Sequence, residues 1–321
     1  MTAPGRARLT VRVVALSVLT ILVVVAAQRL SLARVAAELA VAHPWWIVLA
    51  LIAYLAILPL WAVQWYLLAP ASPRPALRRM AGVIAMTSTV LNTTPLLVGE
   101  AAGIFFLVTE AGLARAAALS VLAMDQLLVG LAKVALLGAA TATATLPFWM
   151  ERGAQALLAG VGALFAVLVV VAWRTDHLAR LASTLLPARG ARLIASVGDA
   201  LAPIRSPSRG GGALALALVK KLAEVVAILC VARAFGVDLP VAGAILVLAM
   251  LSLATLLPIV PGNVGVYEGA VVLAYSHLGV GAERALGIAM VQHACYFAAL
   301  ALPGYRWLAR GAAARRSAAA A

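Results

Sequence analysis

Long apolar runs follow one another along almost the whole chain. A helix needs about 20 consecutive apolar residues to cross the ~30 Å hydrocarbon core of a bilayer. Runs of this length predict six membrane-spanning helices, over residues 10–28, 44–68, 115–146, 152–173, 212–235 and 284–306. We therefore expect a multi-spanning integral membrane protein.

The first apolar run has two interpretations. It follows Arg6, Arg8 and Arg12, and it extends from Val13 to Ala27. A basic start and the small residues 25–27 also fit a signal peptide that is removed after export. The length of the run favours a membrane span.

Two further apolar stretches, 80–111 and 241–278, are too long for one span, and each is interrupted near its middle. The interruptions are Asn92-Thr93-Thr94-Pro95 and the sequence Pro-Ile-Val-Pro-Gly-Asn-Val-Gly at 258–265. Proline removes a backbone donor and glycine permits a sharp turn. Each piece would be roughly 21–25 Å long as a helix, shorter than the hydrocarbon core. We therefore predict two re-entrant helical hairpins, each entering and leaving on one side.

Composition and charge support this topology. Hydrophobic residues make up 65% of the chain and charged residues 11%, against about 25% charged residues in soluble domains. The net charge of +14 comes mostly from arginines beside apolar runs, which is typical of membrane orientation and not of nucleic-acid binding. With both termini cytoplasmic, the basic residues that fall outside are only Arg29, Arg34, Arg152, Arg233 and Arg284.

The predicted elements repeat in inverted orientation. Residues 1–147 and 148–321 each contain a span, a surface segment (29–43 or 174–210), a span, a hairpin and a span. Inverted repeats with interrupted helices at corresponding places are typical of transporters. We predict one all-α membrane domain, 1–321, of six transmembrane helices plus two re-entrant hairpins, with a flexible join at Gly210–Gly212.

Two glutamates follow the interruptions. Glu100 and Glu268 fall in the first turn of the second half-helix of each hairpin. Each carboxylate could cap its own helix and offset the helix dipole. Alternatively, the glutamates form a substrate, proton or cation site, because carboxylates at membrane depth are rare and costly. Both roles can hold at once.

The hairpin tips carry further candidate substrate-binding residues. Asn92, Thr94 and Asn263 could bind head-group oxygens, or they could satisfy backbone groups freed by the breaks, which we favour. Gly262 and Gly265 are expected to serve backbone geometry.

Other polar residues lie within the predicted spans. Asp125 and Lys133 are eight residues apart, on one helix face. They could pair through a neighbouring residue, and such internal neutralisation is favoured over lipid-phosphate binding by Lys133. Lys220 and Lys221 are expected to extend from the inner end of a span towards head groups. His293 is interpreted as a hydrogen-bonding strut.

Enzyme and metal motifs are missing from the sequence. It contains no glycine-rich phosphate loop followed by Lys-Ser/Thr, no His-Glu-x-x-His and no Gly-x-Ser-x-Gly. The two cysteines, Cys230 and Cys295, have no metal-ligand spacing. We expect no enzymatic activity, cofactor or metal, so transport would run downhill, on an ion gradient or with a partner.

The segment Pro261–Ala270, Pro-Gly-Asn-Val-Gly-Val-Tyr-Glu-Gly-Ala, resembles the Pro-Gly-x-x-Gly-x-x-Glu signature of the lysylphosphatidylglycerol synthase transmembrane-region family. Pro95 and Gly99-Glu100 look like its first-half counterpart. The resemblance implies a flippase-like domain of a bacterial cytoplasmic membrane. It also implies anionic or aminoacylated phospholipids as partners, with a separate lipid-modifying enzyme as a candidate partner.

The sequence also departs from the family pattern. Gly103 stands where an arginine often follows, and Asp125-Gln126 replaces a Glu-Arg pair. These changes remove basic residues that would contact lipid phosphate in the first half. The soluble aminoacyl-transfer domain is not present, so we expect no synthase activity.

The sequence leaves three functions open. The first is a lipid flippase or scramblase-like transporter in which a head group passes the hairpin tips. The second is an ion-coupled transporter of a small soluble solute, and the third is a membrane scaffold for a lipid-modifying enzyme.

Overall fold

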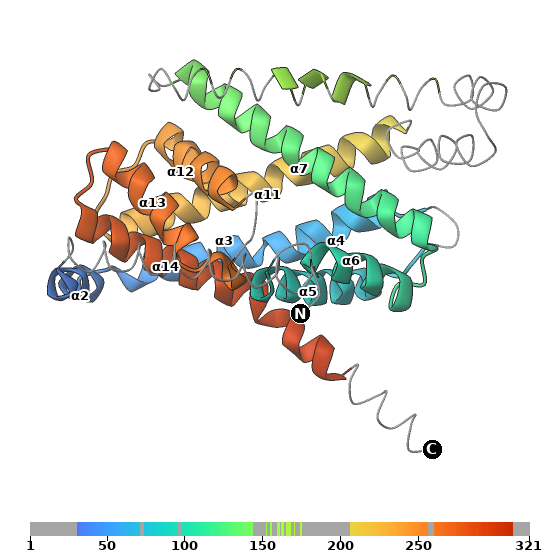
Figure 1. Ribbon diagram of the computed structural model, residues 1–321, viewed down its shortest axis with the longest axis horizontal. Helices are drawn as coiled ribbons and strands as arrows, with labels where there is room; N and C mark the ends of the chain where they lie inside the picture. Colours follow the sequence, from blue (N-terminus) through green and yellow to red (C-terminus); the bar gives the residue numbers. More distant parts are fainter. Residues whose placement is uncertain are drawn as a thin grey trace, which may run out of the picture.

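The computed structural model describes residues 31–70, 74–95, 98–143, 206–255 and 260–310, with isolated residues between 152 and 174. This part of the chain is helical throughout and contains no strand (Figure 1). Its helices are α2 (Leu32–Ala40), α3 (Pro44–Leu55), α4 (Ile57–Leu68), α5 (Leu77–Thr93), α6 (Val98–Thr109), α7 (Arg115–Thr143), α11 (Pro207–Ala234), α12 (Val241–Ala254), the 3-10 turn η1 (Pro261–Asn263), α13 (Val266–His277) and α14 (Ala282–Ala301).

Four of the six predicted spans coincide with long helices. Helices α3 and α4 cover 44–68, while α7, α11 and α14 begin at 115, 207 and 282. Three segments are long and apolar enough to cross a membrane: Pro44–Leu68, Arg115–Ala139 and Ala282–Arg310. The predicted span 10–28 lies outside the described residues, and only isolated residues of 152–173 and the last residues of the segment 174–210 fall within them.

Both long apolar stretches break where the sequence predicts. Helix α5 ends at Thr93 and α6 begins at Val98, while α12 ends at Ala254 and α13 begins at Val266. The second break contains left-handed backbone at Gly262, Asn263 and Gly265, with φ of 64°, 53° and 83°. Helix α5 packs on α6, and α12 packs on α13. Each interrupted stretch therefore folds back on itself as a helical pair.

The predicted flexible join at Gly210–Gly212 is wrong, because these glycines lie inside α11. A Cβ at Gly212 would lie 3.3 Å from Leu67 Cδ1, so the missing side chain lets α11 approach α4 closely. The Arg209 guanidinium donates to the Leu67 carbonyl at 2.8 Å and also to the Ala69 carbonyl. These bonds satisfy carbonyls at the end of α4 that have no partner within their own helix.

Prolines interrupt two of the long segments. Pro59 lies four residues after Leu55, the last residue of α3, so its ring opposes that carbonyl and offers no N–H. Pro303 lies two residues after Ala301, the last residue of α14. The Thr89 hydroxyl of α5 donates to the Ala301 carbonyl at 2.6 Å. A side chain of the neighbouring α5 thus serves the Ala301 carbonyl, whose usual helical donor, the Tyr305 N–H, bonds to the Leu302 carbonyl instead.

The described residues form two main hydrophobic cores, one around each helical pair. One contains Trp65, Met80 and Leu107 among the buried residues of α4, α5, α6 and α7. The other contains Tyr54 and buried residues of α3, α12, α13 and α14. Helix α11 belongs to both, through Ala213 and Ala217 to the first and residues 225–235 to the second. Figure 1 shows α7 and α11 crossing above the path of α3 and α4.

We predict that Thr89→Val lowers the free energy of unfolding by about 1–3 kcal/mol, because it leaves the buried Ala301 carbonyl without a donor while keeping the side-chain shape. Unfolding in mixed detergent micelles, followed by tryptophan fluorescence, measures the change. Thr109→Val is the matched control, because its hydroxyl donates within α6 at an exposed position. Equal losses for the two variants would contradict the role given to Thr89.

Candidate functional site

Buried charges occupy the middle of α11, where the two cores meet. Lys220 and Lys221 are the 14th and 15th residues of this 28-residue helix, and they are only 4% and 9% exposed. The prediction that they extend to lipid head groups is therefore wrong. Helix α11 starts five residues before the predicted span, at Pro207, which moves both lysines away from the helix end.

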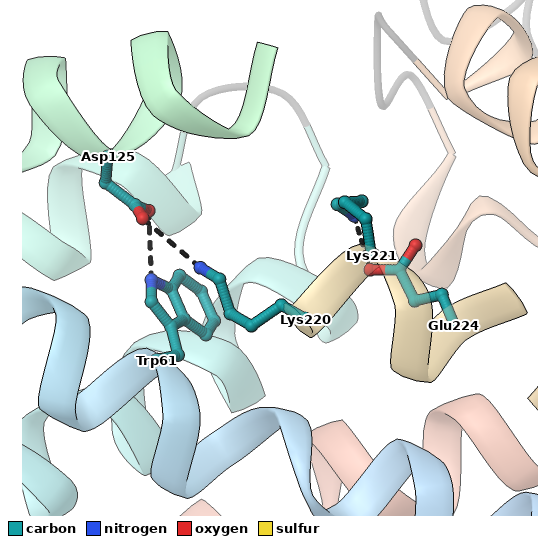
Figure 2. A network of polar contacts seen from close by, with 5 residues as sticks. All are labelled: Trp61, Asp125, Lys220, Lys221 and Glu224. Carbon is teal, nitrogen blue, oxygen red and sulfur yellow. Dashed lines mark hydrogen bonds and ion pairs between the residues drawn. The ribbon is translucent and has the colours of Figure 1, made fainter. Parts of the chain in front are cut away.

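Lys220 belongs to a buried ion pair that joins three helices (Figure 2). Its Nζ lies 3.3 Å from Oδ1 of Asp125 on α7, and both side chains are almost fully buried. The Trp61 indole on α4 donates to Oδ2 of the same carboxylate at 2.9 Å. The neutralisation expected for Asp125 is present, but its partner is Lys220 and not Lys133. Eight residues of helix separate Asp125 from Lys133 by about 12 Å, too far for direct contact.

Lys221 points away from that pair and contacts Glu224, one turn further along α11 (Figure 2). Both side chains line a cavity of about 120 Å³, together with Lys133 of α7. We call this space the polar cavity. Its remaining lining consists of three tyrosines, residues of the second helical pair and apolar side chains: Tyr54, Ile228, Leu248, Leu251, Ser252, Thr255, Gly262, Asn263, Tyr267 and Tyr296.

The charges of the polar cavity do not cancel. Lys133 and Lys221 face a single carboxylate, that of Glu224, which leaves one formal positive charge when both amines are protonated. Burying an unpaired charge is costly. Charge-assisted hydrogen bonds to an anion would offset that cost. Hydroxyl groups and the Asn263 amide in the same wall can bind further oxygens. The cavity is thus suited to a small anionic group.

A second space adjoins the polar cavity. It has a volume of about 300 Å³ and lies between α7 and α12, with a mostly aliphatic lining that includes Val129, Val134 and Ile245. We call it the apolar groove. Lys133, Leu248 and Ser252 line both spaces. A molecule with a polar end and an apolar end can therefore occupy the two together.

The tips of the two helical pairs meet. Turn η1 packs on α5, and a Cβ at Gly262 would lie 3.3 Å from the Asn92 carbonyl oxygen. The Asn92 amide and the Thr94 hydroxyl donate to carbonyls one turn earlier in α5, at 2.8 and 2.7 Å. These two side chains bond back to their own helix, and the Val90 carbonyl also accepts from the Thr94 N–H. Asn263, with Gly262, lines the polar cavity.

The two hairpin glutamates differ in their surroundings. Glu100 lies in the first turn of α6, and its buried Oε2 has no hydrogen-bond partner among the described residues. Glu268 accepts from the Gly265 N–H at 2.6 Å, which caps α13. Its other oxygen lies 2.6 Å from His293 Nδ1 on α14. Glu268 therefore caps its helix, as one alternative predicted, and also binds His293.

Sequence reasoning missed Glu224, Lys221 and the three tyrosines as neighbours of Lys133. One signal was available: the chain has only three lysines, at 133, 220 and 221, and all its other basic side chains except histidine are arginines. A lysine ammonium is a compact point charge on a flexible stem, suited to a confined cavity. All three lysines meet where α7 and α11 pack together.

We predict that Lys220→Met lowers the free energy of unfolding by about 3–5 kcal/mol, because it leaves Asp125 charged, buried and without its cation. The double variant D125N/K220M should recover most of this loss, since both charges are then absent. Detergent unfolding measures both. Asp238→Asn, in the exposed Arg233–Asp238 pair, is the control and should change stability by less than about 0.5 kcal/mol. Additive losses in the double variant would contradict the pairing.

Comparison with known proteins identifies the family of the chain. No curated protein and no solved structure matches the chain significantly. A family profile described as the lysylphosphatidylglycerol synthase TM region matches residues 12–304, which include both helical pairs and the whole polar cavity. Together with its long apolar helices, this match shows that the chain is a membrane protein of the lysylphosphatidylglycerol synthase transmembrane-region family.

Proposed function

We propose that the protein moves a phospholipid, or another lipid with a polar head group, between the leaflets of a bacterial cytoplasmic membrane, and that it carries out no chemical step. The observation that carries this proposal is the wall of Lys133, Leu248 and Ser252 that the polar cavity and the apolar groove share. A phospholipid has the same division into a charged head and an apolar tail.

The lining suggests how such a lipid binds. A phosphate beside Lys133 and Lys221 would satisfy the excess positive charge, and it would compete with Glu224 for the Lys221 ammonium. Oxygens of the rest of the head group would meet the tyrosine hydroxyls and Asn263. An acyl chain would lie along the apolar groove between α7 and α12. Anionic and aminoacylated phospholipids both offer the phosphate that this arrangement requires.

In this proposal the two helical pairs are re-entrant and the two halves are inverted repeats. Helices α5, α6, α12 and α13 contain 17, 12, 14 and 12 residues, or roughly 18–26 Å each, which is short of the hydrocarbon thickness. The pairs would enter from opposite sides, with both termini cytoplasmic. The two cores would rock about α11, which is shared between them, and give the head group access to each side in turn.

The apolar groove favours a lipid over a soluble solute. A solute that dissolves in water needs only the polar cavity, and an aliphatic groove sharing its wall would add nothing to binding. A scaffold without transport needs neither space. A separate lipid-modifying enzyme remains a partner in our proposal only as the source of an aminoacylated head group.

We predict that Lys133→Met and Lys221→Met each slow leaflet exchange of phosphatidylglycerol by about 10- to 100-fold, because each removes a charge-assisted bond worth about 1.5–3 kcal/mol. Exchange is measured in vesicles of phosphatidylcholine with a trace of tail-labelled fluorescent phosphatidylglycerol, quenched from outside. The double variant K221M/E224Q removes the unpaired Glu224 charge and should stay slow. Arg284→Gln, in the peripheral pair with Glu38, is the control. Leaflet exchange at the wild-type rate in both lysine variants would contradict the proposed head-group site.

We predict that Gly130→Leu blocks lipid movement while leaving the polar cavity able to bind a small anion. Gly130 lines the apolar groove, and a Cβ there would meet nothing within 4 Å, so leucine fits the helix and fills the space for an acyl chain. Leaflet exchange and the binding of water-soluble glycerol phosphate are measured on the same preparation. Unimpaired exchange in this variant would exclude the groove as the path of the acyl chain.

A further inference from the structure

A buried carboxylate and imidazole lie beside the polar cavity without lining it. Glu268 Oε1 of α13 is 2.6 Å from His293 Nδ1 of α14, and their side chains are 21% and 9% exposed. The second carboxylate oxygen accepts from the Gly265 N–H. His293 thus has one ring nitrogen committed to the carboxylate, which fixes the orientation of the ring.

Tyr267 connects this pair to the polar cavity. Its ring stacks on the His293 ring with centroids 4.2 Å apart, and the same side chain lines the polar cavity. Its hydroxyl accepts from the Gln292 amide at 2.9 Å. A charge that enters the polar cavity is therefore separated from the imidazole by a single aromatic ring and no intervening helix.

Few titratable groups face the pair. Among the described residues, these are Tyr54 of α3 and Tyr296 of α14, which surround Tyr267. Across the polar cavity they are Glu224 and Lys221 of α11 and Lys133 of α7. Helices α5 and α12 bury no titratable side chain. The charge of the pair is thus governed by its own two members and by the contents of the polar cavity.

We infer that Glu268 and His293 form a proton-binding site that couples lipid movement to a proton gradient. The pair carries a charge of −1 when the imidazole is neutral and 0 after one proton binds; the proton comes from one side of the membrane and leaves to the other. This inference rests on the proposed lipid transport, since it names the ion that would drive it.

The linkage between the two ligands follows from Coulomb attraction. An anionic head group in the polar cavity favours the protonated, neutral state of the nearby pair, and a proton on the pair equally favours the anion, because coupling between two sites is reciprocal. Protonation also changes the charge that faces the first turn of α13, where the helix dipole favours a negative charge. The α12–α13 pair is therefore the element whose position responds to the proton.

One proton moving with one singly charged lipid carries no net charge. Lipid movement should therefore respond to a pH gradient and not to a membrane potential. A gradient of one pH unit should hold about a tenfold excess of the labelled lipid in the leaflet facing the alkaline side. The same ratio is expected when potassium and valinomycin set a potential in either direction.

The test uses the phosphatidylcholine vesicles with tail-labelled phosphatidylglycerol, with an imposed pH gradient. Wild type is expected to reach the tenfold ratio, and Glu268→Gln, which retains an oxygen to accept the Gly265 N–H, is expected to leave the two leaflets equal. Glu38→Gln, in a peripheral ion pair, is the matched control and should keep the ratio. If the wild-type protein moves the lipid but the leaflet ratio does not respond to the pH gradient, proton coupling is wrong and lipid transport is retained. If the wild-type protein moves no lipid, the transport proposal itself is wrong.

A second measurement, of proton uptake on lipid binding, tests the pair even in a variant that moves no lipid. In weakly buffered detergent solution, short-chain phosphatidylglycerol should cause wild type to take up as much as about one proton per protein, by linkage. Glu268→Gln and His293→Asn should take up none. Proton uptake equal to wild type in these variants, or a tenfold leaflet ratio in Glu268→Gln, would show that the pair is not the proton site.

Discussion

A polar group at the depth of a bilayer core has no water to bind, so the protein itself must supply every partner. At several places the described helices meet this demand across their interfaces. Thr89 supplies a donor to the Ala301 carbonyl beside Pro303, and Arg209 supplies one to carbonyls at the end of α4. The buried Asp125 carboxylate receives two donors from two other helices. These bonds connect α5 to α14 and α11 to α4 and α7, so they define how the helices pack.

Local chemistry explains why the helix breaks could be predicted. Proline and glycine act on their own backbone, so Pro95 and the segment 258–265 were sufficient to locate the ends of α5 and α12. The same local reasoning failed at Gly210–Gly212. Glycine weakens an isolated helix, but here its small size admits Leu67 of α4, and this packing outweighs the propensity. The deciding neighbour is about 145 residues away in the chain.

The site was predictable only in part for a related reason. Asn263, Gly262 and Lys133 were identified because interrupted backbone and intramembrane charge are visible in sequence. The i,i+3 spacing of Lys221 and Glu224 is also visible in the sequence, but the partner of Asp125 is not, because that pairing depends on how α7 and α11 are rotated against one another. Lys133 lies on the same face of α7 as Asp125, but the cation that contacts Asp125 is Lys220 of α11. His293 was identified as a strut and Glu268 as a cap or a ligand site, but their contact with one another appears only where α13 and α14 pack together.

The two adjacent lysines of α11 differ in what they contact: Lys220 joins helices, and Lys221 lines the polar cavity. Successive residues of an α-helix point about 100° apart, so Lys220 faces Trp61 and Asp125 while Lys221 faces the polar cavity (Figure 2). The first charge is neutralised by a fixed carboxylate on another helix. The second is held only by Glu224 of its own helix, which can release it to a ligand without breaking any contact between helices. An anion can therefore enter the polar cavity while the Asp125–Lys220 pair keeps α7 and α11 in register. The unmatched positive charge, which is costly to bury, lies only where a ligand can neutralise it.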